Sequence, residues 1–153
     1  MFDLYTVIKF VHVLAAIAWV GGAIMLDMLI SQARRSGSQS DVLMLLAKTE
    51  RYGKTFFSPS AVLVLVAGIV MASIGGIMAA PWVSFGFLGV FISAGLGMGY
   101  LSPKSRQLRQ MIEARGMQDP EAVALGSRMM LISRIDLVLL VLVVAAMVFK
   151  PGM

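Results

Sequence analysis

The sequence contains no cysteine, only one histidine and few charged residues, and each shortage excludes a class of function. Without cysteine the chain has no disulfide framework, no thiolate metal site and no cysteine nucleophile. Only 14% of the 153 residues are charged and 59% are hydrophobic, whereas a soluble domain has ~25% charged residues. A phosphate-binding loop and a nucleophile triad are also missing, so neither a nucleotide enzyme nor a hydrolase is indicated. The composition predicts an integral membrane protein.

Uncharged stretches predict where the chain crosses the membrane. Lys9 and Asp27 bracket one apolar run, and no charged residue occurs between Thr55 and Pro103. That second stretch far exceeds the ~20 residues that one membrane helix needs, and the sequence GGIMAAPWVSFG supplies a turn near Ala80–Pro81. We expect an all-α, four-helix membrane bundle that forms one domain over residues 1–153. The predicted spans are 4–30, 59–79, 83–102 and 130–149.

The basic residues predict how the chain is oriented. Residues 31–57 and 102–129 together carry ten lysines and arginines, whereas the two ends of the chain carry only Lys9 and Lys150. Basic residues gather on the cytoplasmic side of membrane proteins. We therefore expect both long connections inside, both termini outside, and a multi-pass protein of the bacterial cytoplasmic (inner) membrane. The first segment lacks a cationic leader and stays apolar to Ile30, which favours a retained helix over a cleaved signal peptide.

The same charge distribution bears on partners. The net charge of +5 is explained by cytoplasmic basic residues, so nucleic acid is not needed as a partner. The expected partner is the lipid bilayer, with a second copy of the chain or other membrane subunits as further candidates.

Capping residues predict that the cytoplasmic connections are helical extensions of the two hairpins. The sequence SGSQSD breaks the first connection, and Ser40 is the expected N-cap of the helix that follows. In the second connection, Gly116 suits a C-cap, Asp119 an N-cap and Pro120 the first helical position. One helix is then expected over residues 120–149.

Small residues recur every four positions on the second and third spans. They are Gly68, Ala72 and Gly76 on the second span, and Gly89, Ser93 and Gly97, with Gly95 and Gly99, on the third. Such spacing lets helix backbones approach closely inside lipid. The alternative explanation is that glycine is frequent in membrane helices generally.

The first span carries its polar side chains on one stripe. At ~100° per residue, a single line runs through Tyr5, Lys9, His12, Ala16, Trp19, Ala23 and Asp27. Ionisable groups inside a membrane face the bundle interior because exposure to lipid is costly. We therefore expect the stripe to face inward, with a gap at Ala16 between His12 and Trp19.

His12 is the residue best suited to haem, metal or proton chemistry, and three roles are open. It is a hydrogen-bonded interfacial histidine, a haem ligand, or a hydrogen-bond partner for a proton or a quinone. A planar ligand such as haem would lie beside Ala16 with Trp19 as an apolar wall, and Lys9 would pair with a propionate. With one histidine in the chain, the second axial ligand would come from methionine, lysine, water or another copy of the protein.

Two further groups of side chains are candidates for an ion cluster and for a copper site. Asp27 on the first span and Arg134 and Asp136 on the fourth lie near the inner boundary, where we expect a structural ion cluster. Copper is a minor alternative, because thioethers select Cu(I). The candidate methionines are Met25, Met28, Met129 and Met130.

The motif KFVHVLAAIAWVGGAIM, with its lysine, histidine, tryptophan and glycine pair, resembles the first helix of a family of small four-helix bacterial membrane proteins, the domain of unknown function numbered 2269. That family is similar to the copper-resistance D membrane domain and to HemJ-type protoporphyrinogen oxidases. Similarity to the oxidases implies a haem-associated histidine, here His12, but also a lysine on the third helix that this chain lacks. The resulting functional expectation is a haem- or redox-linked membrane subunit centred on His12 and Trp19. The alternative is a non-enzymatic membrane scaffold or a small transporter.

Overall fold

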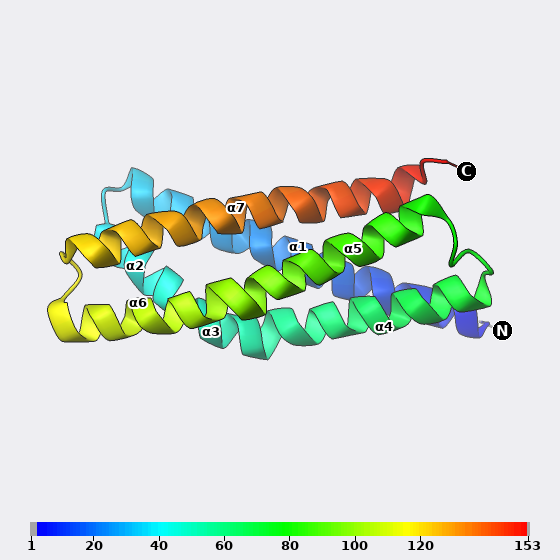
Figure 1. Ribbon diagram of the computed structural model, residues 1–153, viewed down its shortest axis with the longest axis horizontal. Coiled ribbons are helices and arrows are strands. Elements are labelled where there is room, and N and C mark those ends of the chain that lie inside the picture. The colour runs from blue at the N-terminus through cyan, green and yellow to red at the C-terminus, as the bar shows by residue number, and fades with distance from the viewer. Residues whose placement is uncertain (1–2, 153) are drawn as a thin grey trace.

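The computed structural model describes residues 3–152 and is an elongated bundle of helices (Figure 1). Four continuous helical rods are long and apolar enough to cross a membrane, as the sequence predicts. The first rod is α1, Leu4–Arg35. The second comprises α2 (Gln39–Ala47), α3 (Thr49–Tyr52), η1 (Gly53–Phe57) and α4 (Ser58–Ile74). The third comprises α5 (Pro81–Gly95), η2 (Leu96–Leu101) and α6 (Ser102–Arg115), and the fourth is α7, Pro120–Phe149.

Both ends of the described chain lie at the same end of the bundle as the turn between α4 and α5 (Figure 1). The α1–α2 and α6–α7 connections lie at the opposite end, where the basic residues gather. This arrangement is the one that an even number of membrane crossings requires. We call the end with the two connections the basic end.

Local sequence explains where most helices begin and end. Asp3 caps α1 by accepting a hydrogen bond from the Thr6 backbone N–H, at 2.8 Å. The stop at Gly116, with φ +86°, and the start of α7 at Pro120 after the Asp119 cap agree with the sequence.

Two boundaries differ from expectation. The cap of α2 is Ser38 and not Ser40, because the Ser38 hydroxyl accepts the Asp41 backbone N–H. The second rod ends at Ile74, before the expected residue 79, because Gly76 adopts φ +64° and turns the chain.

The bundle is built from two closely packed helix pairs. α1 packs chiefly against α4, and α5 packs chiefly against α7. Glycines permit the close approach within each pair. A Cβ at Gly68 would lie 3.2 Å from the His12 ring, and one at Gly89 would lie 2.2 Å from a methyl of Val143. Long apolar side chains such as Phe10 and Leu131 cover the outside of the rods, as lipid contact requires.

Three buried clusters fill the bundle along its length. The cluster at the basic end includes Ile30, Leu43, Leu46, Leu108 and Met129. The middle cluster comprises Ala15, Trp19, Val64, Val90 and Leu140. The outer cluster comprises Ala72, Trp82 and Val83.

Candidate functional site: an intramembrane cavity

His12 is half-buried and joins α1 to α4. Its Nδ1–H donates a hydrogen bond to the backbone carbonyl of Val64, at 2.9 Å. Gly68, one turn further along α4, lies against the Cε1 side of the same ring. The bond fixes the tautomer, because a carbonyl oxygen only accepts, and it leaves Nε2 as the free ring nitrogen.

The other residues expected beside His12 are spread along α1. Lys9 is exposed, with no ion pair in the described part of the chain. Ala16 packs against the middle cluster and is not among the residues that line the cavity described next. Trp19 is buried and, with Ala23 and Leu26, lines a cavity.

This cavity lies between the two helix pairs and has a volume of about 240 Å³. All four rods contribute to its wall. The lining includes Trp19, Ala23 and Leu26 of α1, Phe57, Ala61 and Leu65 of the second rod, Val90, Ala94 and Gly97 of the third, and Ser133 and Asp136 of α7. The lining is mostly apolar, as it is in small-molecule sites generally.

The cavity reaches the lipid-facing surface. Val62 of α4, and Phe91 and Met98 of the third rod, line it and are also exposed on the outside of the bundle. α4 and α5 contact each other less than each contacts its partner in the two helix pairs. Side chains of α4 and α5 thus line the cavity and also face the outside of the bundle.

Two buried polar atoms in the cavity wall lack partners. They are Ser93 Oγ and Asp136 Oδ1, and neither has a hydrogen bond of ordinary geometry within residues 3–152, although the Ser93 hydroxyl is near enough to the Asp136 carboxyl to interact with it. Ser93 is 2% exposed and lies beside Asp136. Burying a polar group without a partner costs free energy, and burying a carboxylate without a countercharge costs more. No lysine, arginine or histidine lines the cavity.

Two π-helical segments border the cavity at its basic end. Gly53 and Phe57 of η1, and Gly97, Met98 and Leu101 of η2, all contribute to the wall. Gly53 at the start of η1 lies close to the start of α6, directly after η2, since a Cβ at Gly53 would be 3.2 Å from the Ser102 hydroxyl. π-Helical turns are rare and occur frequently at functional sites.

Asp27 and Arg134 form an ion pair, but Asp136 does not join them. Arg134 Nε lies 2.9 Å from Asp27 Oδ1, and its second nitrogen donates to the Ser31 hydroxyl at 2.8 Å. Residues 134 and 136 are two apart, or ~200° around a helix, so their side chains leave α7 in different directions. The expected three-membered cluster is therefore a pair, and Asp136 faces the cavity.

The methionines considered for copper do not converge. Met25 and Met28 are exposed on the outside of α1, whereas Met129 and Met130 are buried at the basic end. No group of three or more histidine, aspartate or glutamate side chains suited to a metal occurs in the described residues.

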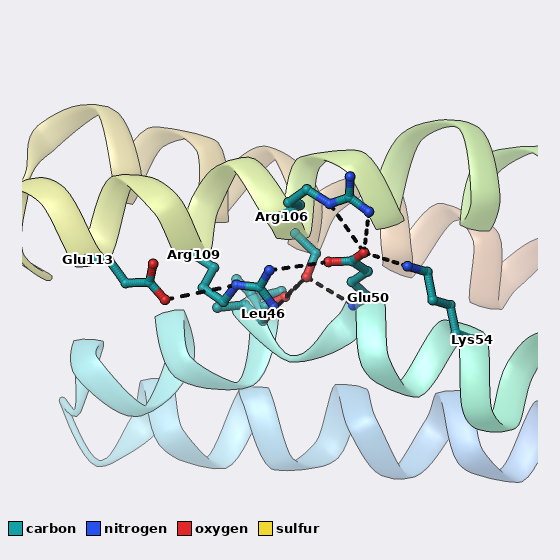
Figure 2. A network of polar contacts seen from close by, with 8 residues as sticks. Leu46, Glu50, Lys54, Arg106, Arg109 and Glu113 are labelled. Carbon is teal, nitrogen blue, oxygen red and sulfur yellow. Dashed lines mark hydrogen bonds and ion pairs between the residues drawn. The ribbon is translucent and has the colours of Figure 1, made fainter.

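A second polar centre lies at the basic end, between α3 and α6 (Figure 2). Glu50 is buried, and Lys54 Nζ and Arg106 NH2 lie 2.8 and 2.6 Å from its Oε1. These cations hold the pKa of the Glu50 carboxyl at about 2, Arg106 through its hydrogen bond having the largest effect. Lys54 follows Glu50 at the i+4 spacing that a sequence reveals, but the partner on α6 depends on how the two hairpins meet.

The fully buried Ser105 fixes the same junction. Its hydroxyl lies 2.9 Å from the Leu46 carbonyl and 3.0 Å from the Ala47 carbonyl, and it accepts the Glu50 backbone N–H. These bonds use carbonyls at the end of α2, where the helical ladder is interrupted. The junction therefore ties the first hairpin to the second.

Comparison with known proteins identifies the chain at the level of a family. A family model described as "Predicted integral membrane protein (DUF2269)" matches residues 6–151. No curated protein and no solved structure gives a significant match. The more distant resemblance to the copper-resistance D domain and to HemJ-type oxidases therefore stays a prediction.

Proposed function

The chain belongs to the DUF2269 family of predicted integral membrane proteins, and we propose that it binds, and passes between lipid and protein, a small amphipathic molecule with a positively charged group. The observation that carries this proposal is the cavity with its unpartnered Asp136. The apolar wall suits a hydrocarbon body. A ligand ammonium would supply the countercharge that the wall lacks, and Ser93 would accept a second hydrogen bond.

The proposal favours the small-transporter alternative over a redox subunit. The Nδ1–H bond from His12 to Val64 is accounted for by helix packing, since it joins α1 to α4 where Gly68 lets the two helices approach. The same bond leaves Nε2 free, as it is in histidines that bind a metal, so the preference for a transporter rests on the cavity and not on His12. Haem binding through Nε2 stays a prediction from the sequence. An absorption spectrum of the purified protein tests it, since a Soret band lost in His12→Ala would restore the redox role.

The remaining expectations are part of the same proposal. We place the protein in the bacterial inner membrane with both termini outside. A second copy of the chain or another membrane subunit would serve as the partner that receives the ligand. The rival function, a scaffold whose polar stripe merely packs the bundle, requires the cavity to have no ligand.

Fluorescence of Trp19 tests the proposal. Trp19 lines the cavity, and Trp82→Phe removes the other tryptophan without losing a hydrogen bond, because Trp82 Nε1 has none in the described residues. The probes are a bromine-bearing alkylamine and the alcohol of equal length, added to protein in zwitterionic nanodiscs. Saturable quenching by the amine is expected, and Asp136→Asn should weaken it at least about tenfold, as the loss of a buried charge partner does.

Variants of the wall separate binding from simple partition into lipid. Ala94→Leu fills the cavity and should weaken quenching by both probes, whereas the matched change Ala124→Leu, on the exposed face of α7, should not. Quenching that never saturates, or that is equal in all variants, would favour the scaffold. Equal affinity for amine and alcohol would overturn the charge assigned to the ligand.

A further inference from the structure

The cations around Glu50 carry excess positive charge, because they outnumber the carboxylates that pair with them. Lys54 and Arg106 share the Glu50 carboxylate, whereas Arg109 lies 3.8 Å from Glu50 and 4.0 Å from Glu113. We call Lys54, Arg106 and Arg109 the basic cluster. Three cations therefore meet two carboxylates, and Glu113 is the more distant and more exposed of the two.

The exposure of these groups shows which of them faces outward. The Glu50 side chain is 9% exposed, whereas those of Lys54, Arg106 and Arg109 are 64%, 56% and 50% exposed. The carboxylate is thus covered, and the cations present their charge to the surroundings. Figure 2 shows Glu50 between Lys54, Arg106 and Arg109.

The cluster lies at the depth of lipid headgroups. Lys54 is the last charged residue before the uncharged stretch from Thr55 to Pro103, and Lys104 is the first after it. Both hairpins therefore leave the hydrocarbon region at this level, since a charged side chain inside it is costly. Lys104 adds positive charge on α6 with no ion pair in the described part of the chain.

The site is held in place before anything binds. Arg106 donates to Glu50 Oε1 from both Nε and NH2, at 3.2 and 2.6 Å, so its guanidinium plane is fixed. The remaining NH1 edge has no hydrogen bond within residues 3–152. A guanidinium fork matches a phosphate group in geometry as well as in charge. Ser105 holds α6 against the end of α2 beside it.

We propose that the basic cluster binds the phosphate of an anionic phospholipid of the inner leaflet. The phosphate lies between Lys54 of the first hairpin and Arg106 of the second, so the bound lipid bridges the two hairpins at their exit from the membrane. The depth of the cluster selects a lipid over a soluble phosphate. This site is separate from the cavity and does not depend on its ligand.

Native mass spectrometry of the full-length protein tests the site. The probes are phosphatidylglycerol and phosphatidylcholine with identical acyl chains, titrated against protein in detergent. The wild type should prefer phosphatidylglycerol, and each of Lys54→Gln and Arg106→Gln should reduce the preference about fivefold, as one cation at the membrane surface does. Arg115→Gln is the matched control, because it removes an exposed arginine that pairs with Asp119 and Glu121 at the start of α7, and it should leave the preference unchanged.

The Lys54→Gln variant and a competition with inorganic phosphate complete the test. If Arg106→Gln fails to fold because Glu50 loses its partner, Lys54→Gln alone decides, since Lys54 is the most exposed of the three. Millimolar inorganic phosphate should displace little of the lipid. Equal affinity for the two lipids, an unchanged preference in Lys54→Gln, or complete displacement by inorganic phosphate would overturn the proposal.

Discussion

At the scale of single residues, three carboxyl groups within the bundle or at its edge differ in the number of cations beside them. Asp27 has one cation, Glu50 has three neighbours of positive charge, and Asp136 has none in the described residues. Unpaired charge in an apolar setting is unfavourable. Asp27 and Glu50 are therefore neutralised within the protein, whereas Asp136 is the group that the proposed ligand would neutralise.

The ion pair between Asp27 and Arg134 should stabilise the α1–α7 contact. Because the Arg134 side chain is 44% exposed, we expect Arg134→Ala to lower stability in detergent by ~1–2 kcal/mol, less than the ~3–5 kcal/mol of a fully buried pair. The double variant with Asp27→Asn should recover part of the loss, and Arg128→Ala is the exposed control. An unchanged melting temperature in Arg134→Ala would contradict the pairing.

The pKa of Glu50 predicts a pH dependence of stability. A carboxyl whose pKa is lowered by folding from 4.5 to about 2 contributes stability above pH 4.5 and loses it as pH falls towards 2. The melting temperature of the wild type should therefore fall across this window. Glu50→Gln should have a lower melting temperature at neutral pH and a shallower acid dependence, and an equally steep acid dependence in Glu50→Gln would refute the assignment.

At the scale of helices, the sequence indicates which elements form better than it indicates how they meet. Uncharged runs and caps such as Asp119 predict the rods, because hydrophobicity and capping are local properties. The π-helical segments η1 and η2 were not predicted, since nothing local distinguishes them from α-helix. The pairing of Glu50 with Arg106 likewise depends on contact between residues far apart in the sequence.

Small residues also show that a local sequence pattern does not determine which residues pack against another helix. The four-residue spacing on the third rod includes Gly89, where an added methyl would meet Val143, but the nearby Gly95 has nothing within 4 Å. Val143 is β-branched and adjusts little. The spacing thus identifies candidates for close packing, and the facing helix decides which of them are used.

Alanine substitutions at these two glycines test the close approach of α5 and α7. Gly89→Ala should destabilise the protein by ~1–3 kcal/mol through overpacking. Gly95→Ala, on the same helix, should be neutral or stabilising by up to ~1 kcal/mol, because alanine favours helix. Thermal unfolding in one detergent compares the two, and equal effects would show that α5 and α7 are not packed as described.

At the scale of the whole molecule, the four-span topology was predictable and the cavity was not. Charge-free length and the distribution of basic residues give the crossings directly. The sequence placed Asp136 in an ion cluster with Arg134, whereas helix geometry directs the two side chains apart. The cavity arises from the space between two helix pairs, which depends on packing across all four rods.

Reporter fusions test the topology. Fusions after Arg35 and after Arg115 should report a cytoplasmic position, and a fusion after Met153 should report an external one, because ten basic residues hold the two connections inside. A cytoplasmic result at Met153 would contradict an even number of crossings.

The most direct test of the central claim is the reaction of Asp136 with an apolar carbodiimide. Such a reagent enters from lipid and modifies carboxyl groups that it can reach and that lack a cationic partner. Peptide mapping by mass spectrometry should find Asp136 modified and Asp27, which is paired with Arg134, largely unmodified. Ala94→Leu should protect Asp136, and so should an excess of a tertiary alkylamine, which carries the positive charge but cannot form an amide with the activated carboxyl group. Modification of Asp27 in preference to Asp136, or labelling of Asp136 that neither treatment changes, would contradict a ligand cavity built around this carboxyl group.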